Sequence, residues 1–80
     1  MSNKQKYDSA FISVLDVNNE TLNDTLVYNS IKTWDSVGHM QLMAAIEDAF
    51  DIMLETDDVI EFSSYTKGIE LLKKYDIEIS

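Results

Sequence analysis

The chain has 80 residues, with six lysines, no arginine and fifteen acidic residues, which give a formal net charge of −9. This charge argues against nucleic acid or an anionic membrane as partner, because both are bound through clustered cations, and the absence of cysteine excludes disulfides, thiolate metal sites and a cysteine nucleophile. No apolar run approaches the roughly 18 residues of a membrane span and the first residues do not resemble a signal peptide, so we expect one cytoplasmic domain over residues 1–80.

The first helix is predicted over about Asn3–Leu15, because its apolar residues recur at helical spacing. These residues are Tyr7, Phe11, Val14 and Leu15. Residues 16–34 show no regular period and are predicted to form a long loop. A loop of this length in a small domain is either functional or well packed, and its apolar side chains favour packing over the core. They are Leu22, Leu26, Tyr28, Ile31 and Trp34.

The second helix is the clearest element and is predicted from near Asp35 and Ser36 to about Asp51. Ser36 is a good N-cap residue, and an acid at position 35 suits the positive end of the helix dipole. A short third helix is predicted over residues 57–62, capped by Thr56. A fourth is predicted over residues 65–75, capped by Ser63 or Ser64.

No segment shows the sustained alternation of a β-strand, and hydrophobic residues at 45% are enough for a globular core. We therefore predict an all-α fold. Its architecture is a small four-helix bundle, with three longer helices, one short third helix and a long loop between the first two helices.

The second helix carries two apolar faces when its residues are placed at 100° intervals. The larger face is predicted to be the core face: Leu42, Ala45, Ile46, Ala49, Phe50 and Met53. The smaller face is apolar with a rim of carboxylates: Val37, Met40 and Ala44, beside Glu47, Asp48 and Asp51. Ordinary surface hydrophobes are one interpretation of this strip, and a docking surface for a basic partner is the other.

The charge distribution favours the docking surface. Residues 33–66 contain no lysine or arginine but hold eight of the fifteen acids. A field of one sign raises the rate of encounter with partners of opposite charge. A plain solvated surface has the same composition, so charge alone leaves both interpretations open.

The segment from Trp34 to Ile52 resembles the acyl carrier protein family. The family pattern is Asp-Ser-Leu or Asp-Ser-Val at the start of a helix, then a spaced Leu, an acidic pair, Phe, an acid or Gly, and Ile. The matching residues are Asp35, Ser36, Val37, Leu42, Glu47, Asp48, Phe50, Asp51 and Ile52. The acids and apolar residues at 57–60 and the Ser-Ser-Tyr at 63–65 match the next part of the family pattern, so the resemblance covers most of the chain.

The resemblance implies that Ser36 carries a 4′-phosphopantetheine arm, which a phosphopantetheinyl transferase adds from coenzyme A. The thiol of the arm would hold an acyl, aminoacyl or polyketide chain as a thioester, in fatty-acid-like or specialised biosynthesis, and the protein itself would not be an enzyme. Acyl-loading and acyl-processing enzymes with basic patches would be its partners, and we expect a monomer. The residues expected to bind them are Asp35, Val37, Met40, Ala44, Glu47, Asp48, Asp51, Asp57 and Asp58.

An apolar interior is expected to shelter part of a short acyl chain, as in relatives of this family. Leu42, Ile46 and Phe50, together with the third helix, are placed for it. Methionines at 40, 43 and 53 would give an adaptable lining, although plain core packing is the alternative for most of these residues.

Three positions near the serine depart from the pattern of fatty-acid carriers. Gly38 and Gln41 stand where those carriers usually have acids, and Trp34 replaces a small residue before the Asp. The docking face is therefore less acidic near Ser36, and the Trp-Asp-Ser sequence resembles that of carriers dedicated to specialised pathways.

The alternatives use the same residues differently. His39 is the only histidine, so we expect it to be packed or partly exposed rather than a metal ligand. Calcium loops starting at Asp16 and Asp51 lack the glycine at the sixth position and are rejected. The remaining alternative to a carrier is an acidic helical adaptor that binds a basic protein, with Ser36 only a helix cap.

Overall fold

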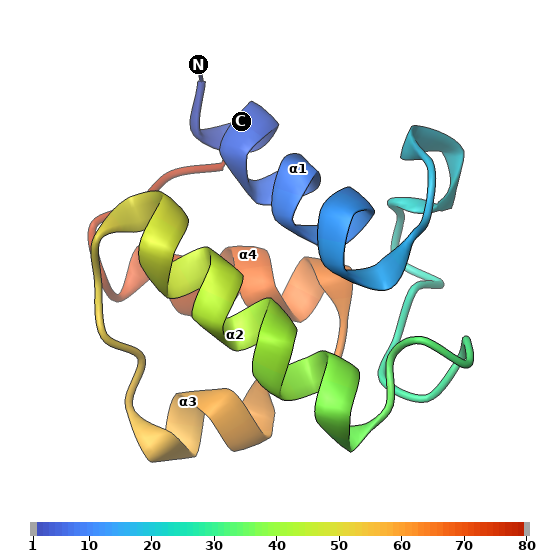
Figure 1. Ribbon diagram of the computed structural model, residues 1–80. Coiled ribbons are helices and arrows are strands. Elements are labelled where there is room, and N and C mark those ends of the chain that lie inside the picture. The colour runs from blue at the N-terminus through green and yellow to red at the C-terminus, as the bar shows by residue number, and fades with distance from the viewer. Residues whose placement is uncertain (1, 80) are drawn as a thin grey trace.

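The computed structural model describes residues 2–79, and within them the protein is all-helical, with a radius of gyration of 11.2 Å. Figure 1 shows the four α-helices, with α2 crossing in front of α4 and α3 below them. The helices are α1 (Asn3–Leu15), α2 (Ser36–Phe50), α3 (Thr56–Glu61) and α4 (Tyr65–Lys73). A short 3₁₀ turn, η1 (Asn19–Thr21), follows α1. The predicted helices are confirmed, and α1 has the predicted bounds.

The helix caps differ in part from those predicted. Asp35, rather than Ser36, is the N-cap of α2, and its carboxylate accepts a hydrogen bond from the Gly38 backbone N–H at 2.9 Å. Ser36 is the first residue of the helix instead. Thr56 is likewise the first residue of α3, whose N-cap position is occupied by Glu55 without a side-chain bond.

The other two helices start with side-chain caps. Ser64 caps α4 as predicted, because its hydroxyl accepts from the Lys67 N–H at 2.9 Å. Ser2 and Gln5 form a reciprocal capping box at the start of α1, a pairing that satisfies two otherwise free N–H groups.

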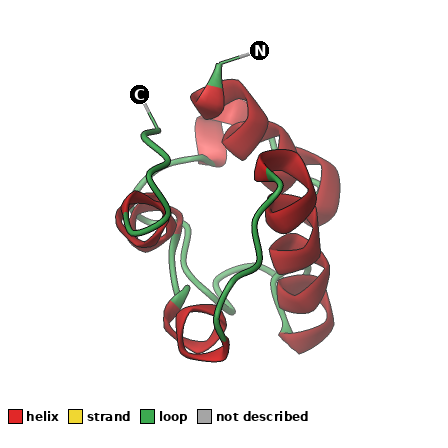
Figure 2. Cartoon of the chain, turned by 90° about the vertical axis from the view of Figure 1, so that its left-hand side faces the viewer, coloured by secondary structure: helices red, strands yellow, loops and turns green. Residues whose placement is uncertain are grey.

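One hydrophobic core lies among the four helices, whose arrangement around it can be followed in the side view of Figure 2. Five aromatic residues form its centre, and their rings meet mostly at tilted or edge-on angles, which is the geometry that aromatic pairs prefer. They are Tyr7, Phe11, Trp34, Phe62 and Tyr65. The buried Tyr7 hydroxyl donates to the Tyr65 backbone carbonyl at 2.6 Å, which joins α1 to α4.

Residues 16–35 connect α1 to α2 and are held against the core. Leu26 and Trp34 are buried, and the Tyr28 N–H donates to the Ser63 carbonyl at 2.8 Å. The Thr33 hydroxyl donates to the Leu15 carbonyl at 2.6 Å. These bonds fix the segment to the end of α1 and the start of α4, so the residues that precede Ser36 have a defined position.

Candidate functional site

Ser36 lies exposed at the first turn of α2, directly after the segment that Trp34 anchors in the core. The helix begins here because Asp35 caps it, which leaves the serine side chain outside the capping interaction. A hydroxyl in this place is open to an external reagent and close to the positive end of the helix dipole. This is the environment in which a phosphate ester is stabilised.

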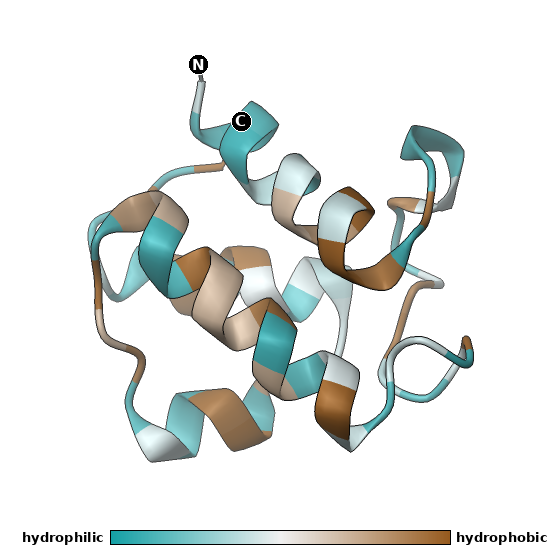
Figure 3. Cartoon of the chain, viewed as in Figure 1, coloured by the Kyte–Doolittle hydropathy of each residue, from teal (hydrophilic) through white to brown (hydrophobic). Residues whose placement is uncertain are grey.

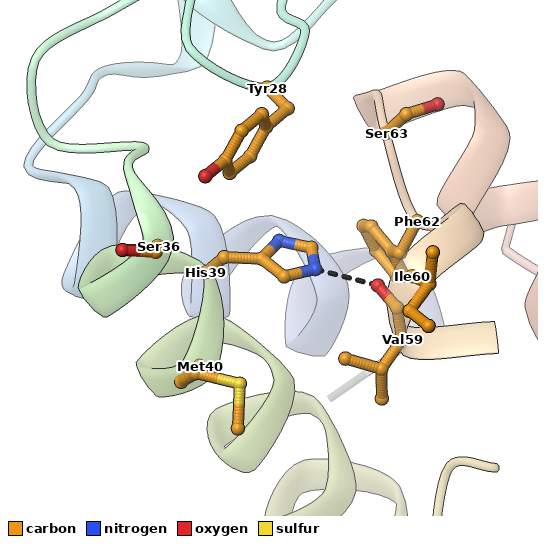
Figure 4. A pocket seen from close by; sticks show the side chains of 8 residues that line it. All are labelled: Tyr28, Ser36, His39, Met40, Val59, Ile60, Phe62 and Ser63. Atoms are coloured by element: carbon orange, nitrogen blue, oxygen red, sulfur yellow. Dashed lines mark hydrogen bonds between the residues drawn. The ribbon is translucent and has the colours of Figure 1, made fainter. Parts of the chain in front are cut away.

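A cavity of about 320 Å³ opens beside Ser36, between the first turns of α2 and the α3 segment. Figure 4 shows its lining, which is mainly apolar and aromatic. The lining residues are Tyr28, Ser36, His39, Met40, Val59, Ile60, Phe62 and Ser63. The exposed hydroxyl therefore stands at the edge of an apolar space, a combination that sequence reasoning did not predict in this place.

His39 on α2 makes hydrogen bonds to Trp34, which precedes the helix, and to Val59 on α3. The Trp34 Nε1–H donates to His39 Nδ1 at 3.0 Å, and His39 Nε2 lies 2.7 Å from the Val59 carbonyl oxygen. Because Nδ1 accepts, the ring is neutral and Nε2 carries the proton that it donates to the Val59 carbonyl. His39 is half-buried, in agreement with the prediction, but its bridging role has no sequence signal beyond the nearby Trp34.

The predicted docking face of α2 is exposed in large part. Val37 and Met40 are each 63% exposed, and Ala44, Asp48 and Asp51 on the same face are also exposed. Glu47 has a second role, because its carboxylate accepts from the Leu54 N–H at 2.8 Å. The Glu47 carboxylate therefore stabilises the turn after α2 and also contributes negative charge to the predicted docking face.

Two further apolar side chains are exposed, one on α3 and one in the segment after α2. Ile60 on α3 is 73% exposed and was not predicted, and Met53, which was predicted on the core face, is 85% exposed. The prediction for Met53 is wrong because α2 ends at Phe50 and Asp51 adopts a left-handed conformation (φ 53°), which turns the chain away. Figure 3 shows apolar residues at the start of α2 and on α3, on the side that faces the viewer.

Of the elements expected to shelter an acyl chain, α3 lines the cavity beside Ser36 through Val59 and Ile60, whereas the three α2 residues do not. Leu42 and Ile46 are fully buried core residues, and none of the three lines the cavity beside Ser36. Phe50 is half-buried at the far end of α2, with the Lys6 ammonium 5.9 Å from its ring centroid. The cavity is formed instead by the first turns of α2 and by α3.

Asp35 and Asp57 are exposed as predicted, but Asp58 is only 1% exposed. Its carboxylate accepts hydrogen bonds from the Lys74 ammonium at 2.6 Å and from the Tyr75 hydroxyl. Asp58 therefore fastens α3 to the segment after α4 and cannot present its charge to a partner, which corrects its predicted role.

Acid should weaken this attachment. Hydrogen bonding by Lys74, and then by Tyr75, holds the pKa of the Asp58 carboxyl below its ordinary value. A carboxyl with a lowered folded-state pKa stabilises the fold above its unfolded pKa of about 4, and that contribution is lost as pH falls through the folded pKa. We expect Asp58→Asn to lower the free energy of unfolding by about 2 kcal/mol at pH 7, with a smaller difference from wild type below about pH 4. Urea titrations at several pH values measure this, and equal stability of the two proteins at pH 7 would contradict it.

No three His, Asp or Glu side chains within residues 2–79 are grouped so as to hold a metal ion. None of the helices described is long and apolar enough to cross a membrane. When the chain is compared with protein-family models, with curated proteins and with solved structures, none of the three comparisons finds a match.

Proposed function

We propose that the protein is a carrier that holds an acyl, aminoacyl or polyketide chain as a thioester on a 4′-phosphopantetheine group attached to Ser36. The observation that carries this proposal is the exposed Ser36 hydroxyl at the first turn of α2, on the edge of an apolar cavity. The carrier would pass its cargo between separate enzymes of fatty-acid-like or specialised biosynthesis and catalyse no step itself. A tethered thiol reaches successive enzymes at high effective concentration.

The residues around Ser36 suit this group. The hydroxyl is accessible, the N-terminal end of α2 favours a negatively charged phosphodiester, and the adjacent cavity offers an apolar surface. Attachment would form a bond between Ser36 Oγ and phosphorus, break the pyrophosphate bond of coenzyme A and release adenosine 3′,5′-bisphosphate, with the serine proton passing to the transferase. The group would supply the thiol that this chain, which has no cysteine, does not have.

In this proposal the four helices form the small bundle of a carrier protein, with residues 16–35 as the long connection between α1 and α2. The protein would act as a cytoplasmic monomer. Its partners would be a phosphopantetheinyl transferase and acyl-loading and acyl-processing enzymes. The exposed strip of Val37, Met40 and Ala44, with the carboxylates beside it, supports docking through basic patches on these enzymes.

Charge reversal on this strip should slow modification. Within residues 2–79 the Asp48 side chain makes no hydrogen bond to a neighbouring element, so it is a simpler position to change than Glu47, whose carboxylate accepts from the Leu54 N–H. We expect Asp48→Lys to reduce kcat/KM of the transferase by about tenfold at low salt, since a lost charge pair of about 1.4 kcal/mol changes the rate by that factor. Glu20→Lys in η1, an exposed position, makes the same change of net charge away from Ser36 and serves as control. Equal kcat/KM values of the transferase for the two variants would show that the α2 face is not part of the docking surface.

A transfer assay with a fluorescent coenzyme A analogue tests the proposal itself. Label should appear on the peptide that contains Ser36 and on no other peptide. The competing candidate is an acidic adaptor, which the exposed Val37, Met40 and Ile60 would equally suit. An adaptor would take no label from any transferase but would still bind a basic protein through this face.

A further inference from the structure

His39 lines the cavity beside Ser36 on the side of the buried Trp34. Its ring stacks on the Trp34 indole with an interplanar angle of 18° and meets the Phe62 and Tyr28 rings edge-on. Trp34 lies behind the His39 ring and is fully buried. The stacked His39 and Trp34 rings therefore lie between the cavity and this part of the core.

Two hydrogen bonds hold the His39 ring in this position. Trp34 Nε1 and the Val59 carbonyl occupy both ring nitrogens, so the ring cannot rotate without leaving a polar group unsatisfied. Figure 4 shows the ring extending from α2 to Val59 across the cavity. Leu42 and Ile46, which are core residues, do not belong to the lining, so a chain that enters beside Ser36 would meet His39 before it reached them.

We propose that His39 is the specificity-determining residue of this cavity and limits its occupant to a short apolar acyl group. A volume of about 320 Å³ has room for about ten heavy atoms, if each takes roughly the 30 Å³ that a water molecule occupies in the liquid. An acyl chain of about six to eight carbons would lie within this space, whereas one of about sixteen carbons would extend out of its open mouth. The inference rests on the proposed function for the identity of the cargo, but the size limit belongs to the cavity itself.

The experiment uses a thiol introduced at the edge of the cavity. Because the chain contains no cysteine, Ser36→Cys provides a single reactive position. Methyl, hexyl and hexadecyl methanethiosulfonates then each form a disulfide with this thiol and release methanesulfinate. Trp34 is the only tryptophan and bonds His39, so its fluorescence, together with the unfolding midpoint, reports what enters the cavity.

The hexyl adduct should have a higher unfolding midpoint and shifted Trp34 emission relative to the methyl adduct. The hexadecyl adduct should give no increase beyond that of hexyl. Equal midpoints and emission for methyl and hexyl would overturn the cavity as a binding site, and a further increase with hexadecyl would overturn the size limit. The same reagents on Glu20→Cys, an exposed position in η1, serve as control and should show no dependence on chain length.

Two substitutions then separate the bulk of His39 from its hydrogen bonds. In the Ser36→Cys background, His39→Ala should make hexadecyl more stabilising than hexyl, whereas His39→Leu, which restores bulk without the bonds, should keep the preference for hexyl. The same chain-length profile in both variants would contradict a steric limit. If His39→Ala does not fold, Met40→Trp fills the cavity from its exposed mouth and should remove the hexyl effect.

These measurements require neither coenzyme A nor a transferase. A negative result with the disulfide series therefore leaves attachment at Ser36 standing. Conversely, failure of every transferase would reject the carrier function without altering the measured size limit of the cavity.

Discussion

Replacing Ser36 by alanine should abolish attachment of phosphopantetheine and leave the free energy of unfolding within about 0.5 kcal/mol of wild type. The fold is expected to tolerate the change because the Asp35 carboxylate, and not the serine hydroxyl, caps α2 through the Gly38 N–H. Ser36 is exposed and helical, and alanine is the residue that favours helices most. Intact-protein mass after incubation with coenzyme A and a transferase, together with urea unfolding, measures both parts.

Asp35→Ala is the matched control for this result. It removes the cap and keeps the hydroxyl, so it should cost about 1 kcal/mol of stability while Ser36 remains available for modification. The interpretation of Ser36 would be wrong if Ser36→Ala destabilised the protein more than Asp35→Ala. It would equally be wrong if Ser36→Ala gained the same mass as wild type.

The second large effect is expected at Gly38, where Ala should destabilise the protein by about 3 kcal/mol. A Cβ built on Gly38 would lie 1.9 Å from the Thr33 carbonyl oxygen, a backbone atom that a rotamer change cannot move aside. Thr33 is itself held by its hydrogen bond to the Leu15 carbonyl. Alanine would gain up to about 1 kcal/mol in helix propensity over glycine, so a net loss of stability would show that the steric clash outweighs the gain in propensity.

Gln41→Glu provides the comparison for Gly38. Both positions carry acids in fatty-acid carriers, but Gln41 is exposed whereas Gly38 is buried. We expect Gln41→Glu to change stability by less than about 0.5 kcal/mol, as measured by urea unfolding of the two variants side by side. A Gly38→Ala protein as stable as wild type would show that the segment before α2 moves aside without cost.

The helices could be predicted because each one combines apolar residues at helical spacing with polar residues at its ends. The prediction of α1 over Asn3–Leu15 agrees with the structure, and its apolar period correctly places Tyr7 and Phe11 in the core. The prediction for Met53 fails because it extends the helical period beyond residue 50, whereas the left-handed Asp51 ends the helix. A helix ends at a left-handed residue of this kind, so the helical period no longer predicts which side chains beyond it are buried.

The site could be predicted only where it depends on local sequence. Ser36 at a helix start and the exposed strip of α2 follow from the motif and from helical rotation. Asp57 and Asp58 are adjacent acids in one helical turn, and only the contacts with Lys74 and Tyr75, sixteen and seventeen residues away, bury the second of them. Such long-range pairs have no local signal.

The position of the cavity could not be predicted for the same reason. It depends on a bridge from His39 to Val59, twenty residues apart, and on Tyr28 from the connection between α1 and α2. From the sequence alone, Gly38 could be interpreted only as the absence of an acidic side chain near Ser36. The structure explains why a glycine stands at this position: the Thr33 backbone occupies the space that a side chain would need.

The intact mass of the wild-type protein, after incubation with unmodified coenzyme A and a broad-specificity phosphopantetheinyl transferase, tests the central claim most directly. The carrier proposal predicts the gain of one phosphopantetheinyl group per chain, located on Ser36. No gain with any of several transferases, from a protein that is folded by circular dichroism, would contradict the carrier and favour the acidic adaptor.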